Sequence, residues 1–377
     1  MSEPRLDPPP PPSRGDPLDL PRLRQLLLAA GYERTASIPA FSSRTIKPWL
    51  NRTVARRLEQ GQPLPLACHS HPSRYLNGLP APLQRLYRVL YLHDQVPIEG
   101  MEELIELGLL ETVDDSLCQS RLQVTALPHP GGTRFILSSV PGRTPGPFVY
   151  LGDDSGHLIE AARDIPADGR ALDICCGCGV VGLCLPTGYS EVRGLDANAS
   201  AIELARWNAI LNGECVQGAA VSFDESDLWS AADGRYQLVI GNPPALPLTD
   251  THPDLQFARG GQRPTELTCK TVEGLHRHLA PGGRCILLSF SVDGQLWDDL
   301  LPLLDPGWSL RWRVRDSHPL PGGKWLHHVW LDIRHDGRRE RLRQGPSWSQ
   351  RLLNFGWPFS RAEKPAQKNY MRFGGSR

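Results

Sequence analysis

From about residue 150 the sequence alternates short apolar runs with helical stretches, and this alternation constrains the fold more than any other feature. "GRALDICCGCGVVGL", residues 169–183, runs from an apolar strand into a glycine-rich turn and a helix. "EVRGLDANASAIELARWNAILNG", residues 191–213, repeats the strand and the helix. Further strand-like runs are "VQGAAVSF", "YQLVIG" and "GRCILLSF", with helices expected near 264–279 and 294–304. This order predicts a parallel sheet with helices on both faces.

The end of this region predicts an antiparallel strand pair. "WSLRWRVRD" alternates apolar and polar residues, and "WLHHVWLDI" follows it after the turn "PLPGGK". Two such runs joined by a short proline-glycine turn are typical of neighbouring antiparallel strands. We therefore expect an α/β domain over residues 149–335, with a Rossmann-like, mostly parallel sheet and an antiparallel last strand.

The first 148 residues predict a leader and a helical accessory domain. Residues 1–17 are polar and contain five consecutive prolines, which is typical of a disordered or polyproline II segment. Residues 18–148 form the expected accessory domain. Helical apolar spacing occurs in four stretches of it: 20–31, 48–60, 82–94 and 99–111.

A hairpin is expected at the end of the accessory domain. The strand-like runs "SRLQVTAL" and "TRFILSSV" are joined by "PHPGG", a turn signal. Helices followed by a hairpin resemble a winged helix. Two interpretations stay open: a helical domain that covers an active site, which we favour because the hairpin carries few positive charges, and a nucleic-acid reader.

Composition excludes several classes of protein. The 377 residues include 41 basic and 41 acidic side chains, so the whole molecule has no net attraction for nucleic acid or acidic membranes. No apolar run approaches the roughly 20 residues that span a bilayer, and the N-terminus has no apolar signal segment. The nine cysteines are an odd number and several lie in expected strands, which indicates reduced thiols and a cytoplasmic protein.

The last segment, residues 336–377, is basic and is expected to be an irregular, solvated end. A contact with RNA or another protein is the alternative interpretation. Its early charged residues are mostly arginines: Asp336, Arg338, Arg339, Glu340, Arg341 and Arg343.

The glycine-rich turn identifies a candidate cofactor site. Gly177, Gly179 and Gly182 satisfy G-x-G-x-x-G between a strand and a helix, and Asp196 follows at the distance of a ribose-binding acid. That fingerprint alone allows a nicotinamide dehydrogenase. Asp173, four residues before the first of these glycines, would oppose a pyrophosphate and attract a cationic cofactor such as S-adenosylmethionine.

Four motifs in order resemble those of class I S-adenosylmethionine-dependent methyltransferases. "ALDICCGCGVVGL" and "GLDANASAIELARWNAILNG" are similar to the first two motifs, "ESDLW" to the third, and "GNPPA" to the fourth motif of enzymes that methylate planar nitrogens, including the HemK-like glutamine methyltransferases. The resemblance covers roughly 150–335 and implies S-adenosylmethionine as cofactor. The residues that it assigns to cofactor binding are Asp173, Cys175, Gly177, Gly179, Asp196, Ala197, Asp227, Leu228 and Asn242.

The resemblance implies that the Asn-Pro-Pro segment holds the methyl acceptor. Oxygen acceptors from Asn242 and Pro243 would bind the N–H groups of an amide or exocyclic amine and stabilise positive charge that develops on nitrogen. Prolines fix φ, so Pro243 and Pro244 would stiffen this acceptor pair. The alternative is that Asn-Pro-Pro only ends a strand. No metal site is expected, because the cysteines of the glycine loop have no second ligand pair at zinc spacing and the "CHSH" segment is expected in a surface loop.

Ala245 departs from the family pattern, in which a Tyr or Phe stacks on the planar acceptor. Either Phe257 or Trp229 replaces that ring, or the acceptor is a smaller amide such as a glutamine side chain. The expected substrate-binding residues are Pro244, Ala245 and Phe257. The leading hypothesis is an N-methyltransferase acting on a protein or small-molecule amide. The alternatives are methylation of a ribosomal or transfer RNA base, with RNA bound by the accessory domain or the basic tail, and an inactive cofactor-binding regulator.

Overall fold

The structure of the chain is a computed structural model. It describes residues 18–37, 76, 78–140, 143–144, 149, 151–213, 215–216, 219–245, 265–319, 323–338 and 340–344. The expected leader, the helix expected over 48–60, the "CHSH" segment and Phe257 lie outside the described residues. Among the described residues, no helix has both the length and the apolar character to cross a membrane.

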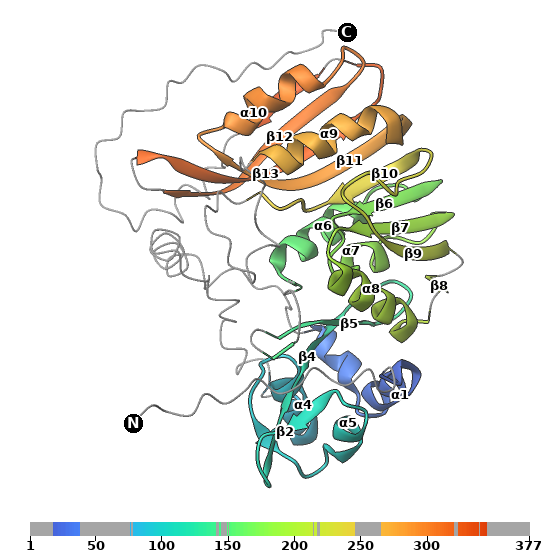
Figure 1. The fold of residues 1–377 in the computed structure, drawn as a ribbon, viewed down its shortest axis with the longest axis vertical. Coiled ribbons are helices and arrows are strands. Elements are labelled where there is room, and N and C mark those ends of the chain that lie inside the picture. The colour runs from blue at the N-terminus through green and yellow to red at the C-terminus, as the bar shows by residue number, and fades with distance from the viewer. Residues whose placement is uncertain are drawn as a thin grey trace, which may run out of the picture.

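A nine-stranded sheet forms the centre of the molecule (Figure 1), in the order β14-β12-β13-β11-β10-β6-β7-β9-β8. Its parallel part consists of β6 (Arg170–Ile174), β7 (Glu191–Asp196), β9 (Ala219–Glu225), β10 (Tyr236–Gly241) and β11 (Leu279–Val292). β13 (Trp325–Arg334) runs antiparallel to both β11 and β12 (Ser309–Pro319). The short β8 (Cys215–Val216) pairs antiparallel with β9. The expected Rossmann-like sheet with an antiparallel closing pair is therefore confirmed.

Helices cover both faces of this sheet, as the alternating sequence predicts. One face carries α6 (Asp153–Arg163), α7 (Val180–Leu183) and α8 (Ala199–Leu211). The other carries α9 (Glu266–His278), α10 (Gln295–Leu300) and the short 3-10 helix η3 (Leu301–Leu303). Strand residues alternate between two apolar cores, because successive side chains of a strand point to opposite faces. Asn198 caps α8 by accepting a hydrogen bond from the backbone N–H of Ser200, at 3.0 Å.

The accessory part begins with helices and a small sheet. Its elements are α1 (Leu20–Ala29), η1 (Tyr32–Ser37), α4 (Ala81–Leu90), β1 (Val96–Pro97), α5 (Glu102–Glu106), β2 (Leu110–Thr112) and β3 (Leu117–Ser120). The three strands form an antiparallel sheet in the order β1-β3-β2. The helix expected over 99–111 is wrong in length, because the chain turns at Gly108, whose φ of 76° lies in the left-handed region.

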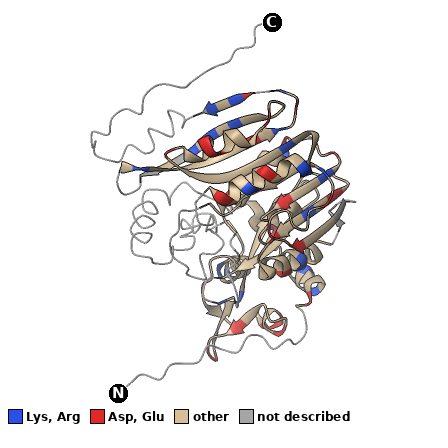
Figure 2. Cartoon of the chain, turned by 45° about the horizontal axis from the view of Figure 1, so that its top comes forward, with Lys and Arg blue, Asp and Glu red and all other residues tan. Residues whose placement is uncertain are grey.

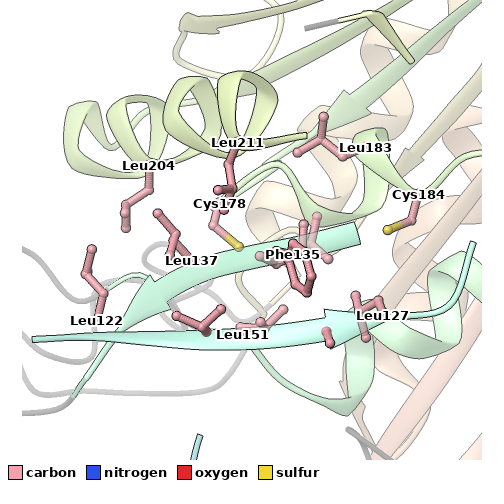
Figure 3. Packing of buried hydrophobic residues seen from close by; sticks show 14 of the residues in the cluster. Leu122, Leu127, Phe135, Leu137, Leu151, Cys178, Leu183, Cys184, Leu204 and Leu211 are labelled. Carbon is pink, nitrogen blue, oxygen red and sulfur yellow. The ribbon is translucent and has the colours of Figure 1, made fainter. Parts of the chain in front are cut away.

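The expected hairpin forms, but it is not an exposed wing. β4 (Leu122–Leu127) and β5 (Arg134–Ser139) pair antiparallel with each other as a separate two-stranded sheet. Every residue of both strands is buried. The side chains of β5 pack against α8, so the hairpin joins the accessory part to the α/β domain (Figure 3). The strands of this hairpin are buried against protein, and the winged-helix likeness stays a prediction.

The prediction of an irregular tail from residue 336 is wrong for its first part. β14 (Arg341–Gln344) pairs parallel with β12 and completes the edge of the sheet. Arg341 donates to the carbonyl oxygens of Trp308 and Leu304, and the Arg343 guanidinium lies 5.7 Å from the centre of the Trp312 ring. Arg341 and Arg343, two of the arginines that indicated a solvated end, therefore contact the last strands of the domain and the segment before them.

Candidate active site

The carboxyl ends of three neighbouring strands meet at one edge of the sheet. β6 lies between β10 and β7, and its last residue Ile174 pairs with Gly241 on one side and Leu195 on the other. The chain crosses from β6 to β7 in one direction, while β10 lies in the other direction. Such a switch point is where open α/β sheets bind ligands. The glycine loop after β6 and the Asn-Pro-Pro segment after β10 both begin at this edge.

Gly241 brings β10 unusually close to β6 just before Asn-Pro-Pro. A Cβ atom at this position would lie 2.3 Å from the carbonyl oxygen of Ile174. Only glycine fits there, so the position of the segment that follows is fixed by the strand pairing. Of the residues that follow, Asn242 and Pro244 are half-buried, and Pro243 and Ala245 are buried.

The glycine loop is held by the carboxylate at the end of β7. Cys175 and Gly177 both have positive φ angles, 58° and 54°, and Gly179 precedes α7 with a φ of 76°. The backbone N–H of Gly177 donates to Asp196 Oδ2 at 2.8 Å, and that of Asn198 donates to Asp196 Oδ1 at 2.9 Å. A positive φ is uncommon for cysteine, and such strained residues cluster at ligand sites. Asp196 therefore joins the first and second motifs into one structure.

Asp173 lies beneath the loop, not facing a cofactor as its position in the sequence suggested. Its side chain is 1% exposed, and Oδ2 accepts a hydrogen bond of 2.8 Å from the backbone N–H of Gly182 in α7. Burial is the largest cause that raises the pKa of Asp173; the Gly182 hydrogen bond lowers this pKa, the charge of Asp196 raises it, and the net value is about 7. The carboxylate is therefore bound to α7 through its hydrogen bond with Gly182.

The charge around the loop fits S-adenosylmethionine better than a dinucleotide. Burial raises the pKa of the Cys175 thiol strongly, and the carboxylates of Asp196, Asp173 and Asp227 raise it further. Three carboxylates thus act on the same point at the end of β6. A cofactor with an ammonium and a sulfonium group suits such a site, whereas a pyrophosphate would be repelled. Asp196 would accept from the ribose hydroxyls and Asp173 would act from below.

The third motif lies next to the second. The backbone N–H of Ser226, directly after β9, donates to the carbonyl oxygen of Asp196 at 2.9 Å. Asp227 is exposed, and Leu228 has a positive φ of 49°. Ala197, also exposed, lies between Asp196 and the N-cap of α8. The structure thus gathers all the predicted cofactor residues at one edge of the sheet.

Trp229 does not replace the aromatic ring that Ala245 lacks. Its indole stacks on the His278 ring, with centres 4.9 Å apart and planes 6° apart. Its Nε1 donates to the carbonyl oxygen of Lys270 at 3.2 Å. Both partners belong to α9, so the indole packs against that helix and not at the Asn-Pro-Pro segment. The other candidate, Phe257, lies outside the described residues.

The cysteines around the glycine loop are free thiols, and three of them, Cys176, Cys178 and Cys184, are buried in the apolar core. Burial raises the pKa of Cys178 and of Cys184 to about 12 in each case. Protonated thiols are poor metal ligands, because the thiolate is the form that binds. In the part of the chain that the structure describes, no cluster of three or more His, Cys, Asp or Glu side chains could hold a metal ion.

Sequence reasoning missed Asn208 and Asn212, which connect this region to the accessory part. Both are buried, at 0% and 7% exposure. Asn208 lies on the otherwise apolar buried face of α8, and Asn212 is the C-cap of that helix. The signal was two asparagines four residues apart, on the same face of a predicted helix. A buried amide needs hydrogen-bond partners, so this pair already indicated polar backbone packed against α8.

Comparison with known proteins identifies the α/β domain. Residues 151–289 match the family model described as the methyltransferase small domain. The chain is 32% identical over 155 residues to a putative protein N5-glutamine methyltransferase of Methanocaldococcus jannaschii, covering 40% of this chain and 76% of that protein. It is 29% identical over 143 residues to ribosomal RNA small subunit methyltransferase C of Alcanivorax borkumensis, covering 37% of this chain but only 39% of that protein.

A solved structure of ribosomal protein L11 methylase from Lactobacillus delbrueckii is 17% identical to this chain, with a TM-score of 0.31. The match covers 48% of this chain and 77% of that chain, and a likeness this weak supports no inference. The sheet order, the glycine loop with its carboxylates and the match to the M. jannaschii protein agree with one another. The cofactor of such domains is S-adenosylmethionine. The chain belongs to the class I S-adenosylmethionine-dependent methyltransferases.

Proposed function

We propose that the chain methylates the planar nitrogen of an amide in a protein or small molecule. The observation that carries this proposal is the position of Asn242-Pro243-Pro244, directly after β10 and beside the glycine loop of β6. A segment with two prolines is rigid, because each fixes φ and removes a backbone donor. It leaves oxygen acceptors at the edge where the cofactor is expected.

The chemistry requires help because an amide nitrogen is a weak nucleophile whose lone pair is delocalised. When bound, S-adenosylmethionine supplies an electrophilic methyl group on a cationic sulfur. The Asn242 side-chain oxygen and the Pro243 carbonyl oxygen would accept hydrogen bonds from the acceptor N–H groups and orient the nitrogen. These same oxygens would stabilise the positive charge that develops there, and the proton would then pass to solvent.

Two observations favour an amide over a nucleobase. Ala245 is 3% exposed and offers no ring on which a flat base would stack, an interaction worth about 1 to 3 kcal/mol. The M. jannaschii relative is named a putative protein N5-glutamine methyltransferase. A glutamine side chain is planar at its nitrogen but needs no stacking platform. Free buried thiols favour a reducing compartment, so we place the reaction in the cytoplasm.

A ribosomal RNA base is the second candidate acceptor. Several relatives are named ribosomal RNA small subunit methyltransferase C, although this chain spans well under half of each. Arginines also gather on the strands at the sheet edge (Figure 2). Several of them are engaged within the molecule: Arg311 pairs with Glu340, Arg341 binds backbone carbonyl oxygens, and Arg343 lies over two tryptophan rings. This engagement weakens the case for an RNA-binding edge.

Labelling would identify the acceptor class. The protein is incubated with cell extract and S-adenosylmethionine tritiated in the methyl group, and the extract is then divided into protein, RNA and small-molecule fractions. We expect label in protein or small molecules that survives ribonuclease. Label confined to ribonuclease-sensitive material would replace the proposal with RNA base methylation. Cofactor binding without transfer to any fraction would favour an inactive regulator.

Substitution of Asn242 separates acceptor chemistry from cofactor binding. Asn242→Ala removes one of the two proposed oxygen acceptors, so turnover should fall by about 100-fold or more. The dissociation constant of S-adenosylmethionine, measured by calorimetry, should change less than about two-fold, because Asn242 is proposed to act mainly on the acceptor. Gln237→Ala, on the exposed side of the same strand, is the matched control and should retain activity. Lost cofactor affinity in Asn242→Ala would contradict the proposed role.

A further inference from the structure

The accessory hairpin supports the underside of the cofactor loop. Apolar side chains of β4 and β5 pack against α7, α8 and the loop that leads into them (Figure 3). The residues that form this contact include Leu122, Leu127, Phe135, Leu137, Cys178, Leu183, Cys184, Leu204 and Leu211. The contact therefore joins residues that are far apart in the sequence into one core.

Asn208 makes a polar connection through this apolar contact. Its Oδ1 accepts from the backbone N–H of Leu137 at 2.7 Å, and its Nδ2 donates to the carbonyl oxygen of Leu137 at 2.9 Å. The same Nδ2 donates to the carbonyl oxygen of Cys178 at 2.9 Å. The side chain is fully buried, so every one of these bonds lies away from water. One amide thus joins β5 to the centre of the glycine loop.

Asn212, one helical turn later, holds the hairpin without touching the loop. Its Oδ1 accepts from the backbone N–H of Phe135 at 2.9 Å, and its Nδ2 donates to the Phe135 carbonyl oxygen at 2.7 Å. It also donates to the backbone carbonyl oxygen of Asn208. The two asparagines bind β5 in the same manner. Asn208 alone also binds the glycine loop, at Cys178, whereas the further partners of Asn212 are the Asn208 carbonyl oxygen and Arg24 Nη1, which donates to Oδ1 at 3.4 Å.

The turn of the hairpin makes a second contact with the same segment. His129 Nδ1 accepts a hydrogen bond of 3.0 Å from the backbone N–H of Gly131. The proton of the neutral ring is then on Nε2, which donates to the carbonyl oxygen of Leu185 at 3.1 Å, just after α7. Burial lowers the pKa of His129, which favours the neutral ring that this pattern requires. The hairpin is thus linked through Asn208 to the start of the segment that runs from the glycine loop through α7, and His129 contacts Leu185 just after its end.

We propose that the accessory hairpin positions the cofactor loop, with Asn208 as the positioning residue, so that S-adenosylmethionine binding and hairpin docking stabilise each other. The Cys178 carbonyl bond fixes the peptide plane that carries the Gly179 N–H, which itself donates to Cys176. Loss of the bond would leave the buried Cys178 carbonyl without its hydrogen bond and would allow the peptide between Cys178 and Gly179 to rotate. Two sites that stabilise one shared conformation are coupled equally in both directions. The inference concerns cofactor binding and does not depend on which acceptor is methylated.

The matched variants Asn208→Ala and Asn212→Ala test the proposal in the full chain. Both remove the pair of bonds to β5, so both should lower the melting temperature. Only Asn208→Ala also removes the bond to the loop, so its dissociation constant for S-adenosylmethionine should rise about five-fold or more above that of Asn212→Ala. In a methylation assay its KM for S-adenosylmethionine should rise while kcat stays near that of Asn212→Ala. Equal cofactor affinity in the two variants would overturn the proposal.

Hydrogen exchange of the unmodified protein provides a test that needs no variant to fold. At saturating S-adenosylmethionine the backbone amides of Phe135 and Leu137, which the two asparagines bind, should exchange several-fold more slowly than without it. The amide of Cys118, in β3 of the small accessory sheet, is the internal control and should change less. Unchanged exchange at Phe135 and Leu137 would overturn the coupling, whatever the activity of the enzyme.

Discussion

Asp173 is a buried carboxylate whose charge opposes folding and would attract a cationic cofactor. Its ordinary pKa lies near 4, and burial under the glycine loop raises it to about 7. Between these values the folded chain keeps a proton that the unfolded chain releases. Stability from this group is therefore greatest below pH 4, declines as pH rises toward 7, and is then constant. A cationic cofactor would compensate this cost by stabilising the ionised form.

Asp173→Asn should raise the stability of the folded chain and lower its affinity for the cofactor. The amide can still accept the Gly182 hydrogen bond but carries no charge, so the free energy of unfolding at pH 8 should rise by on the order of 2 kcal/mol. S-adenosylmethionine should bind about ten-fold more weakly at that pH. Denaturant unfolding and calorimetry at pH 8 and pH 5 check both effects, and the stability gain should shrink at pH 5. A variant that is less stable than the original at pH 8 would contradict this account.

At the residue scale the sequence predicted which residues lie together but not the direction of every side chain. The motif spacing placed Cys175, Gly177 and Asp196 at one edge of the sheet, and the structure brings them together there. It did not reveal that Asp173 points beneath the loop. Side-chain direction at a strand end depends on the register against neighbouring strands, and that register is a tertiary property.

At the element scale, α9 supports the turn that carries the third motif. Trp229, two residues after Asp227, packs onto α9 where Gly274 leaves room for the indole. A Cβ atom at 274 would lie 2.1 Å from Trp229 Nε1. The packing of Trp229 therefore couples the turn of the third motif to α9.

Gly274→Ala should disturb cofactor binding from a distance. The added methyl group displaces the indole from its stack on His278, at a cost of about 1 to 3 kcal/mol in stability. The turn at Asp227 shifts with it, so the dissociation constant of S-adenosylmethionine should rise several-fold. Glu273→Ala, at an exposed position of the same helix, is the control and should change neither quantity. Retained affinity in a destabilised Gly274→Ala would show that the turn is independent of α9.

Elements with a strong apolar pattern were predictable, and those without one were not. The alternating runs at 308–316 and 325–333 became β12 and β13, in the expected antiparallel pair. β14 was missed because "RLRQ" has almost no apolar residues, and at a sheet edge its position depends on backbone pairing and arginine contacts. The hairpin β4-β5 was predicted as a hairpin, but its partner was not, because local sequence does not encode which distant helix covers a strand.

For the whole molecule, the predicted boundary between residues 148 and 149 does not separate two hydrophobic cores, because residues from both sides of it belong to one core. One apolar cluster runs from Leu20 in α1 through the hairpin to Leu288 in β11. Arg24 in α1 donates to the carbonyl oxygen of Leu211, the last residue of α8, at 3.1 Å. The accessory part is therefore a structural component of the methyltransferase domain.

A fragment of residues 149–344 should consequently fold poorly. Without the accessory part, apolar side chains of α7 and α8, including Leu183, Leu204 and Leu211, would face solvent. The fragment should bind an apolar fluorescent dye, unfold without a sharp transition and aggregate, where the full chain under the same conditions does not. A monomeric fragment that unfolds cooperatively and binds S-adenosylmethionine as tightly as the full chain would contradict this expectation.

The contact between β5 and α8 also has a consequence for biosynthesis. Leu137 and Asn208 are 71 residues apart in the chain. A ribosome that adds about 5 to 20 residues per second emits the hairpin about 4 to 14 s before the helix that covers it. Throughout that delay a nascent chain presents two apolar strands with no helix to pack against. Translational pauses between these two segments would therefore lengthen the exposure of an aggregation-prone hairpin, and faster elongation there would shorten it.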